Sequence, residues 1–235
     1  PMLALLASAG LPVDPVVSLI HNVTKDEAMS SEHHWQMYTG THDLSKRLEV
    51  RKWRGKRTVD FWGSPDCNRV HGRRASGKAP LHPAQPTVHL WTQQLFRSVP
   101  LALVPGSFET HGIPVDRYQV DLHGFANTSG VPSNSCYNQF GPSGVANLTA
   151  PMDGVPLFVS LPGFCGGDST LATPFPNFTC NPAYMPSFEY DQVTGLLLRA
   201  NLGLQYNVKL VGLPGIGEWQ TQDPVVFPVF RLEQT

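Results

Sequence analysis

The densest group of chemically active side chains in the sequence is basic. Eleven Lys and Arg residues lie between Lys46 and Lys78, against only three acidic ones, although the whole chain has a net charge of −1. Five of these cations surround Trp53: Arg51, Lys52, Arg54, Lys56 and Arg57. Such a cluster suits anionic ligands such as phospholipid headgroups, oxidised lipids, lipoproteins or sulfated glycans. A solvated strand face would give the same pattern, so both interpretations stay open.

No spacing in the sequence indicates catalysis or metal binding. Gly141-Pro-Ser-Gly-Val departs from the nucleophile elbow G-x-S-x-G at its last position, and the carboxylates are few and scattered. His33, His34 and His42 could together bind a metal, but no spacing such as H-E-x-x-H supports a site. We therefore predict a protein that is not an enzyme, with no cofactor and no bound metal.

Cysteines and glycosylation motifs indicate an oxidising compartment. Four asparagines begin N-x-[S/T] motifs and are candidate glycosylation sites: Asn22, Asn127, Asn147 and Asn177. The sequence has four cysteines, which allow three pairings: Cys67, Cys136, Cys165 and Cys180. None forms a C-x-x-C pair, which disfavours zinc, so we expect two disulfides. Glycosylated, disulfide-bonded proteins rarely meet nucleic acid, and no nucleic-acid partner is predicted.

The elements that must position these residues are predicted to be mainly strands. A β-hairpin is expected in which segments 48–53 and 58–62 flank the turn Arg54-Gly-Lys-Arg57. Further strands are expected from apolar alternation or short apolar runs, at residues 88–91, 99–104, 117–122, 157–161, 196–198, 202–210 and 225–232. Residues 1–30 are the most helix-like part of the chain and are predicted to form a pair of short helices.

Composition favours the same fold class. Hydrophobic residues make up 41% of the 235 residues, enough for a sizeable core, while 21 Gly and 22 Pro suit many short strands joined by turns. No domain boundary is evident, so we treat the chain as one domain. No apolar run approaches the ~18 residues that a membrane-spanning helix needs.

Motifs in sequential order resemble the class B scavenger receptors, a family that includes the fatty-acid translocase, the high-density-lipoprotein receptor and the lysosomal integral membrane protein. The first block is Tyr38-Thr-Gly40, Trp53-Arg-Gly55, Asp60-Phe-Trp62 and Asp66-Cys-Asn68. His111-Gly-Ile-Pro114 with Arg117-Tyr118, Gly144-Val-Ala-Asn-Leu-Thr149, Ser160-Leu-Pro-Gly-Phe164, Asp191-Gln-Val-Thr-Gly195 and Val225-Val-Phe-Pro-Val-Phe230 follow in the family's order. The resemblance covers residues 38–232.

The resemblance implies a mainly β fold. Expected is an antiparallel, β-barrel-like ectodomain with a hydrophobic tunnel and short peripheral helices. Residues 1–34 would form part of a helical cap and 35–235 the β-rich region of a single partial ectodomain, with the membrane anchors outside the chain. Alternating strands such as Val99–Leu103 and Leu202–Leu210 could line the tunnel or belong to ordinary core.

The resemblance also implies partners and a disulfide. Cys67 and Cys136 fall on family cysteines and are expected to pair, whereas Cys165 and Cys180 have no family counterpart. The implied function is a membrane glycoprotein receptor that binds lipids, lipoproteins or other anionic ligands and passes lipid through the tunnel to the membrane. The alternative is a lysosomal or endosomal sorting or adhesion receptor that binds a protein. Either way the segment would be extracellular or lumenal, at the cell surface or in the endosome or lysosome.

Overall fold

The computed structural model describes residues 35–81, 83–127, 132–137, 141–176, 178–212 and 224–234. The chain divides into two units between residues 34 and 35, and every described residue belongs to the second unit. The helical cap predicted for residues 1–34, with its helix pair at about 1–30, lies outside the described residues.

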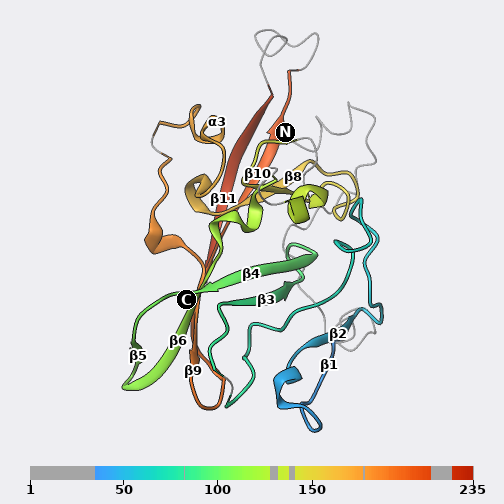
Figure 1. Ribbon diagram of the computed structural model, residues 1–235. Helices are drawn as coiled ribbons and strands as arrows, with labels where there is room; N and C mark the ends of the chain where they lie inside the picture. The colour runs from blue at the N-terminus through green and yellow to red at the C-terminus, as the bar shows by residue number, and fades with distance from the viewer. Residues whose placement is uncertain are drawn as a thin grey trace, which may run out of the picture. The chain divides into compact units, whose positions relative to one another are not determined.

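The described residues are dominated by antiparallel strands, which confirms the mainly β class. A nine-stranded sheet contains β3 (Thr87–Thr92), β4 (Arg97–Leu103), β5 (Phe108–Thr110), β6 (Ile113–Val120), β7 (Val145–Asn147), β8 (Leu157–Ser160), β9 (Ser187–Asp191), β10 (Leu197–Leu210) and β11 (Val225–Gln234). Its main path runs β3-β4-β6-β9-β10-β8-β7, with β11 beside β10 and β5 beside β6 (Figure 1). Strands β1 (Trp35–Met37) and β2 (Val50–Trp53) form a separate pair.

The sheet remains open, because the two ends of this path, β3 and β7, do not pair within the described residues. The expectation of a barrel-like sheet is therefore corrected to an open one. Figure 1 shows β10 and β11 as the longest ladder of the sheet. Strand β10 pairs with β9 along its first part and with β8 along its last part, so it links the two halves of the sheet.

Strands with a simple apolar pattern match the sequence expectations best. In β3, Val88 and Leu90 are buried while the alternate residues Thr87 and His89 are exposed, as alternation predicts. Strand β8 is buried on both faces, because Leu157 and Val159 pack into one core cluster and Phe158 packs into another, which explains its apolar run. In contrast, β9 was not predicted: its centre is buried on both faces, yet it includes the charged Glu189.

Short helices fill the connections between strands. The described ones are η2 (Leu44–Lys46), η3 (Leu122–Phe125), η4 (Pro132–Tyr137), η5 (Pro162–Phe164), α3 (Ser169–Ala172) and η6 (Pro182–Tyr184). Asp43, Asp121, Asp168 and Asn181 cap four of them by accepting hydrogen bonds from main-chain N–H groups. No helix in the described part of the chain has the length and apolarity that a bilayer crossing requires.

Candidate ligand-binding surface

The basic cluster is organised by a two-residue turn. Trp53 and Lys56 exchange two main-chain hydrogen bonds, each with an N···O distance of 2.9 Å. The central residues Arg54 (φ 49°) and Gly55 (φ 74°) are both left-handed, as a type I′ turn requires. Residues Trp53 to Lys56, together with Arg51, Lys52 and Arg57, are called the basic turn below.

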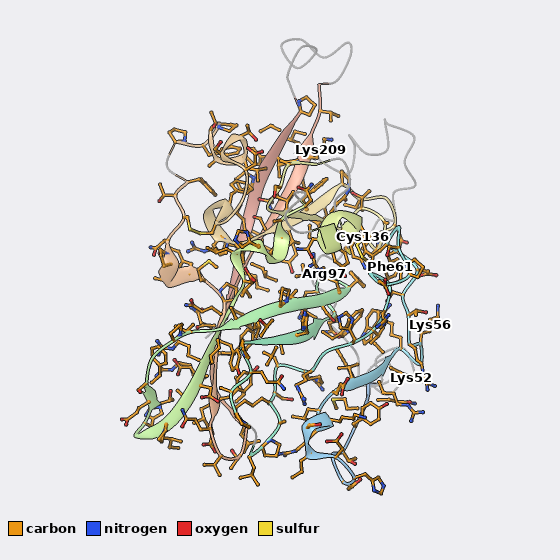
Figure 2. All side chains as sticks on the ribbon, in the orientation of Figure 1. Lys52, Lys56, Phe61, Arg97, Cys136 and Lys209 are labelled. Carbon is orange, nitrogen blue, oxygen red and sulfur yellow. A yellow bond between two sulfur atoms is a disulfide. The ribbon has the colours of Figure 1, made fainter. Side chains whose placement is uncertain are left out.

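The basic turn presents its cations to solvent. Arg51, Arg54, Lys56 and Arg57 are exposed and Lys52 is half-buried. Figure 2 shows Lys52 and Lys56 on the same side of the β2 segment, with their side chains directed outward. Among the described residues, no carboxylate forms an ion pair with any of the five. Their charges are therefore available to an anionic ligand.

Trp53 fixes the basic turn to the core. Its side chain is only 4% exposed and contacts Trp91 and Phe96, with ring centroids 5.9 and 5.8 Å away. The Arg54 guanidinium lies over the same indole, 4.5 Å from its centroid, a cation–π contact. Burial of the ring therefore holds the flanking cations on a rigid base.

The predicted hairpin is wrong in its second arm. Strand β2 pairs with β1, matching Trp53 with Trp35, and segment 58–62 is not a strand. Instead, Thr58 bridges Arg69, and the main chain of Trp62 exchanges two hydrogen bonds with the Asn68 amide at 2.9 and 2.8 Å. Because the Asn68 side chain supplies the partners a strand would provide, this segment turns away from β2 immediately after the basic turn.

Two disulfides hold the loops around the sheet. Cys67 is bonded to Cys136, the pairing that the resemblance implies, and Cys165 is bonded to Cys180. The first closes a separation of 69 residues and the second one of 15. Loop-closure entropy predicts stabilisations of about 4 and about 3 kcal/mol.

An apolar cavity of about 70 Å³ lies against the sheet. Val99 and Leu101 of β4 line it together with Leu202 and Leu204 of β10, so two strands suggested as tunnel lining meet there. Phe188 of β9 closes part of the wall. The space equals roughly two water molecules at about 30 Å³ each, too little for an acyl chain.

The two described candidate glycosylation sites differ in whether the amide nitrogen of the asparagine is hydrogen-bonded. The Asn127 side-chain amide donates to the Gly141 carbonyl at 2.8 Å, which occupies the nitrogen that a glycan would need. At Asn147 the oxygen accepts from the Thr149 N–H at 2.9 Å, while the amide nitrogen makes no hydrogen bond within the described residues. Asn22 and Asn177 lie outside the described residues.

Metal ligands do not converge in the described part of the chain, where no group of three or more His, Cys, Asp and Glu side chains could hold an ion. His42 is exposed, and its proposed partners His33 and His34 lie outside the described residues. Sequence reasoning also missed a polar pocket around Arg97 (described below), because residues from separate parts of positions 64–137 form it and no short motif connects them.

Comparison with known proteins gives one family and two kinds of relative. The model of the CD36 family matches residues 4–235. Scavenger receptor class B member 1 of Cricetulus griseus is 30% identical over 201 residues, 85% of this chain and 39% of that protein, and its Mus musculus counterpart is 29% identical over the same shares. Lysosome membrane protein 2 of Mus musculus is 26% identical over 239 residues, 94% of this chain and 49% of that protein. The chain thus spans less than half the length of these relatives.

Proposed function

Because this chain belongs to the CD36 family, that of the class B scavenger receptors, we propose that it forms part of a receptor that captures anionic lipids or lipoproteins and passes lipid inward. The segment is the extracellular or lumenal part of a membrane protein, as its relatives and its two disulfides indicate. The basic turn is the single observation that carries the proposal.

Capture rests on the charge and rigidity of the basic turn. Its cations have no ion-pair partner among the described residues, and Trp53 fixes them to the core. Each Lys or Arg near an anionic membrane contributes about 1 kcal/mol of binding free energy. Several such side chains on one turn are enough to retain a vesicle or lipoprotein surface.

Lipid passage is supported by the apolar cavity between β4 and β10. An acyl chain requires an apolar path in which no polar group is left buried without a partner. The cavity lining is almost entirely aliphatic and aromatic, so it meets that condition locally. We propose that the cavity is a closed part of a path that widens when lipid enters.

Vesicle binding tests the capture step. Reversing four charges (Arg51→Glu, Lys52→Glu, Arg54→Glu and Arg57→Glu) should abolish sedimentation of the chain with phosphatidylserine vesicles. Vesicles of phosphatidylcholine, which has no net charge, are the control and should sediment neither wild type nor variant. Unaltered secretion and thermal melting would show that the variant folds. Wild-type binding to phosphatidylserine vesicles by this folded variant would refute the role of the turn.

A second candidate is a lysosomal or endosomal receptor for a protein. One observation supports it: the match to Lysosome membrane protein 2 covers 94% of this chain, against 85% for scavenger receptor class B member 1, although its identity is lower, 26% against 30%. Expression of the complete protein with a fluorescent tag separates the two candidates. Surface delivery favours the lipid receptor, whereas retention with lysosomal markers favours the second.

A further inference from the structure

A pocket lined mainly by polar side chains lies beside the Cys67–Cys136 disulfide. Its volume is about 820 Å³, and it is separate from both the basic turn and the apolar cavity. Figure 2 shows Arg97 and Cys136, which both line it, close together in this view. It is called the Arg97 pocket below.

Arg97 is a buried cation without a carboxylate partner. Its residue is 2% exposed, and no described carboxylate forms an ion pair with it. One terminal nitrogen, Nη2, donates to the Gly124 carbonyl at 2.9 Å and to Asn134 Oδ1 at 3.1 Å, and Nε donates to the Ser98 carbonyl at 3.3 Å. The guanidinium stacks 3.6 Å from the Tyr137 ring centroid.

These contacts orient the guanidinium without neutralising it. Burial lowers the pKa of Arg97 and the neighbouring Tyr137 partly raises it, with a net value of about 10. The guanidinium therefore still carries its charge at neutral pH. Its second terminal nitrogen, Nη1, makes no hydrogen bond with the described residues. A buried charge is costly unless it is paired. The described residues thus supply no anionic partner for Arg97, and the pocket can accept an anion in that role.

Three histidines line the same pocket. His71 and His89 face each other with ring centroids 5.8 Å apart, and His123 lies on η3. His71 Nδ1 lies 3.0 Å from the Arg69 carbonyl oxygen, to which it donates, so Nε2 is the acceptor nitrogen of the neutral ring. Burial, and then the proximity of His71, lower the pKa of His89 below its usual value.

The remaining charged groups of the pocket balance one another. Asp66 forms an ion pair with Arg69 at 2.8 Å, and Asp121 accepts the His123 main-chain N–H at 2.9 Å. Two carboxylates therefore oppose Arg69 and Arg97 when the histidines are neutral. Histidine is the side chain whose ordinary pKa lies near neutral pH, and an imidazole that takes up a proton adds a positive charge that no further described carboxylate in the lining offsets.

We propose that the Arg97 pocket binds a tetrahedral oxyanion, a phosphate or sulfate group that is free or carried by a lipid headgroup, and that it binds this anion more tightly as the pH falls. A tetrahedral anion has enough acceptor oxygens for the guanidinium and several imidazoles at once, whereas a carboxylate has two. The inference does not depend on capture at the basic turn, because it concerns different residues.

Calorimetry with inorganic sulfate tests the proposal, since sulfate keeps its charge across this pH range and any pH dependence comes from the protein. An anion that raises one histidine pKa by one unit gains up to about tenfold in affinity when that group protonates. Between about pH 7.5 and about pH 5.5, on either side of the usual histidine pKa, one such histidine gives about a fivefold gain. Sulfate should therefore bind the chain at least about fivefold more tightly at the lower pH.

Matched variants assign the effect to the pocket. The pair His71→Gln and His89→Gln should remove most of the pH dependence, and Arg97→Gln should abolish binding. His42→Gln, an exposed histidine outside the pocket, and Lys209→Glu, an exposed cation of β10 outside the pocket, should leave the sulfate affinity unchanged. If Arg97→Gln is not secreted, the double histidine variant still tests the proposal. It should fold, because neither His71 nor His89 is buried in the core.

Dioctanoyl phosphatidic acid distinguishes the two sources of the anion. Competition between this soluble lipid and sulfate would support a headgroup ligand, and sulfate binding without competition would support a free oxyanion. Absence of sulfate binding at both pH values, equal affinity at both, or an unaltered pH dependence in the histidine pair would overturn the proposal.

Discussion

Glu189 illustrates how single residues in this protein balance burial against charge. It lies at the centre of β9 and is 3% exposed. Arg117 donates to it through Nε at 2.9 Å and approaches it through Nη2 at 2.7 Å, while Thr110 donates its hydroxyl. Burial opposes ionisation, but these hydrogen bonds and the charges of Arg117 and Arg199 outweigh burial and hold the Glu189 pKa below its usual value.

Replacing Glu189→Gln should destabilise the chain at neutral pH. The glutamine amide keeps one acceptor oxygen, but the negative charge that strengthens the hydrogen bonds from Thr110 and Arg117 is lost, which costs about 2 kcal/mol. A carboxyl whose pKa is lowered by folding stabilises the native state above its unfolded pKa of about 4.3, and this contribution is lost as the pH falls through the lower folded value. Denaturant unfolding should show the difference between variant and wild type at pH 7 and its decrease on acidification. An equal difference at all pH values would contradict this assignment.

Asn147 should be the more completely glycosylated of the two described motifs. Its amide nitrogen makes no hydrogen bond with described residues, whereas that of Asn127 is occupied by the Gly141 carbonyl. Mass spectrometry of the chain secreted from mammalian cells should show one glycan fewer in Asn147→Gln. Asn127→Gln serves as the matched control and should change the glycan mass less. The reverse order would show that folding follows glycosylation at Asn127.

At the scale of elements, strands with one clear apolar pattern could be predicted from the sequence. Prediction fails for segments whose conformation is set by contacts with residues distant in the chain. Strand β3 could be predicted from its alternation and β8 from its apolar run. Strand β9 could not, because Glu189 is buried by partners that come from β5, β6 and β10. Segment 58–62 has a strand-like composition, but the Asn68 side chain replaces the expected strand partner.

The basic turn could be predicted from Gly55, but its pairing could not. Gly55 adopts a φ of 74°, and an added Cβ would meet no atom within 4 Å. Gly55→Ala should therefore cost about 1 kcal/mol through backbone strain alone. Gly55→Asn is the matched control, because Asn tolerates the left-handed conformation. The melting temperature of Gly55→Asn should be higher than that of Gly55→Ala. A Gly55→Ala melting temperature equal to that of wild type would show that the turn is not constrained.

For the whole molecule, the class and the oxidising environment could be read from motifs and cysteines, while the ligand sites required the fold. The Arg97 pocket combines residues of β3, β4, η3 and η4 with the loop that contains Cys67. The apolar cavity likewise joins β4 and β10, about a hundred positions apart in the chain. Such distant pairs leave no local pattern, and any one apolar residue in them resembles ordinary core.

Lipid passage makes a prediction at the same scale. Leu204→Trp should fill the apolar cavity and lower the affinity for a fluorescent long-chain fatty acid about tenfold, the equivalent of about 1.4 kcal/mol. Leu198→Trp on the same strand is the control, since Leu198 is 38% exposed and outside the cavity lining. Fluorescence titration compares them, with thermal melting to verify folding. Equal affinities of the two folded variants would place the lipid elsewhere.

Capture of anionic lipid is the central claim, and one matched pair of charge reversals tests it most directly. Lys56 and Lys209 are both exposed, one on the basic turn and the other on β10, and Figure 2 shows them far apart in this view. Both reversals alter the net charge equally. Binding to phosphatidylserine vesicles should weaken at least about fivefold in Lys56→Glu, from the ~1 kcal/mol that one cation contributes, and stay near wild type in Lys209→Glu. Equal loss in both variants, or no loss in either, would contradict the account.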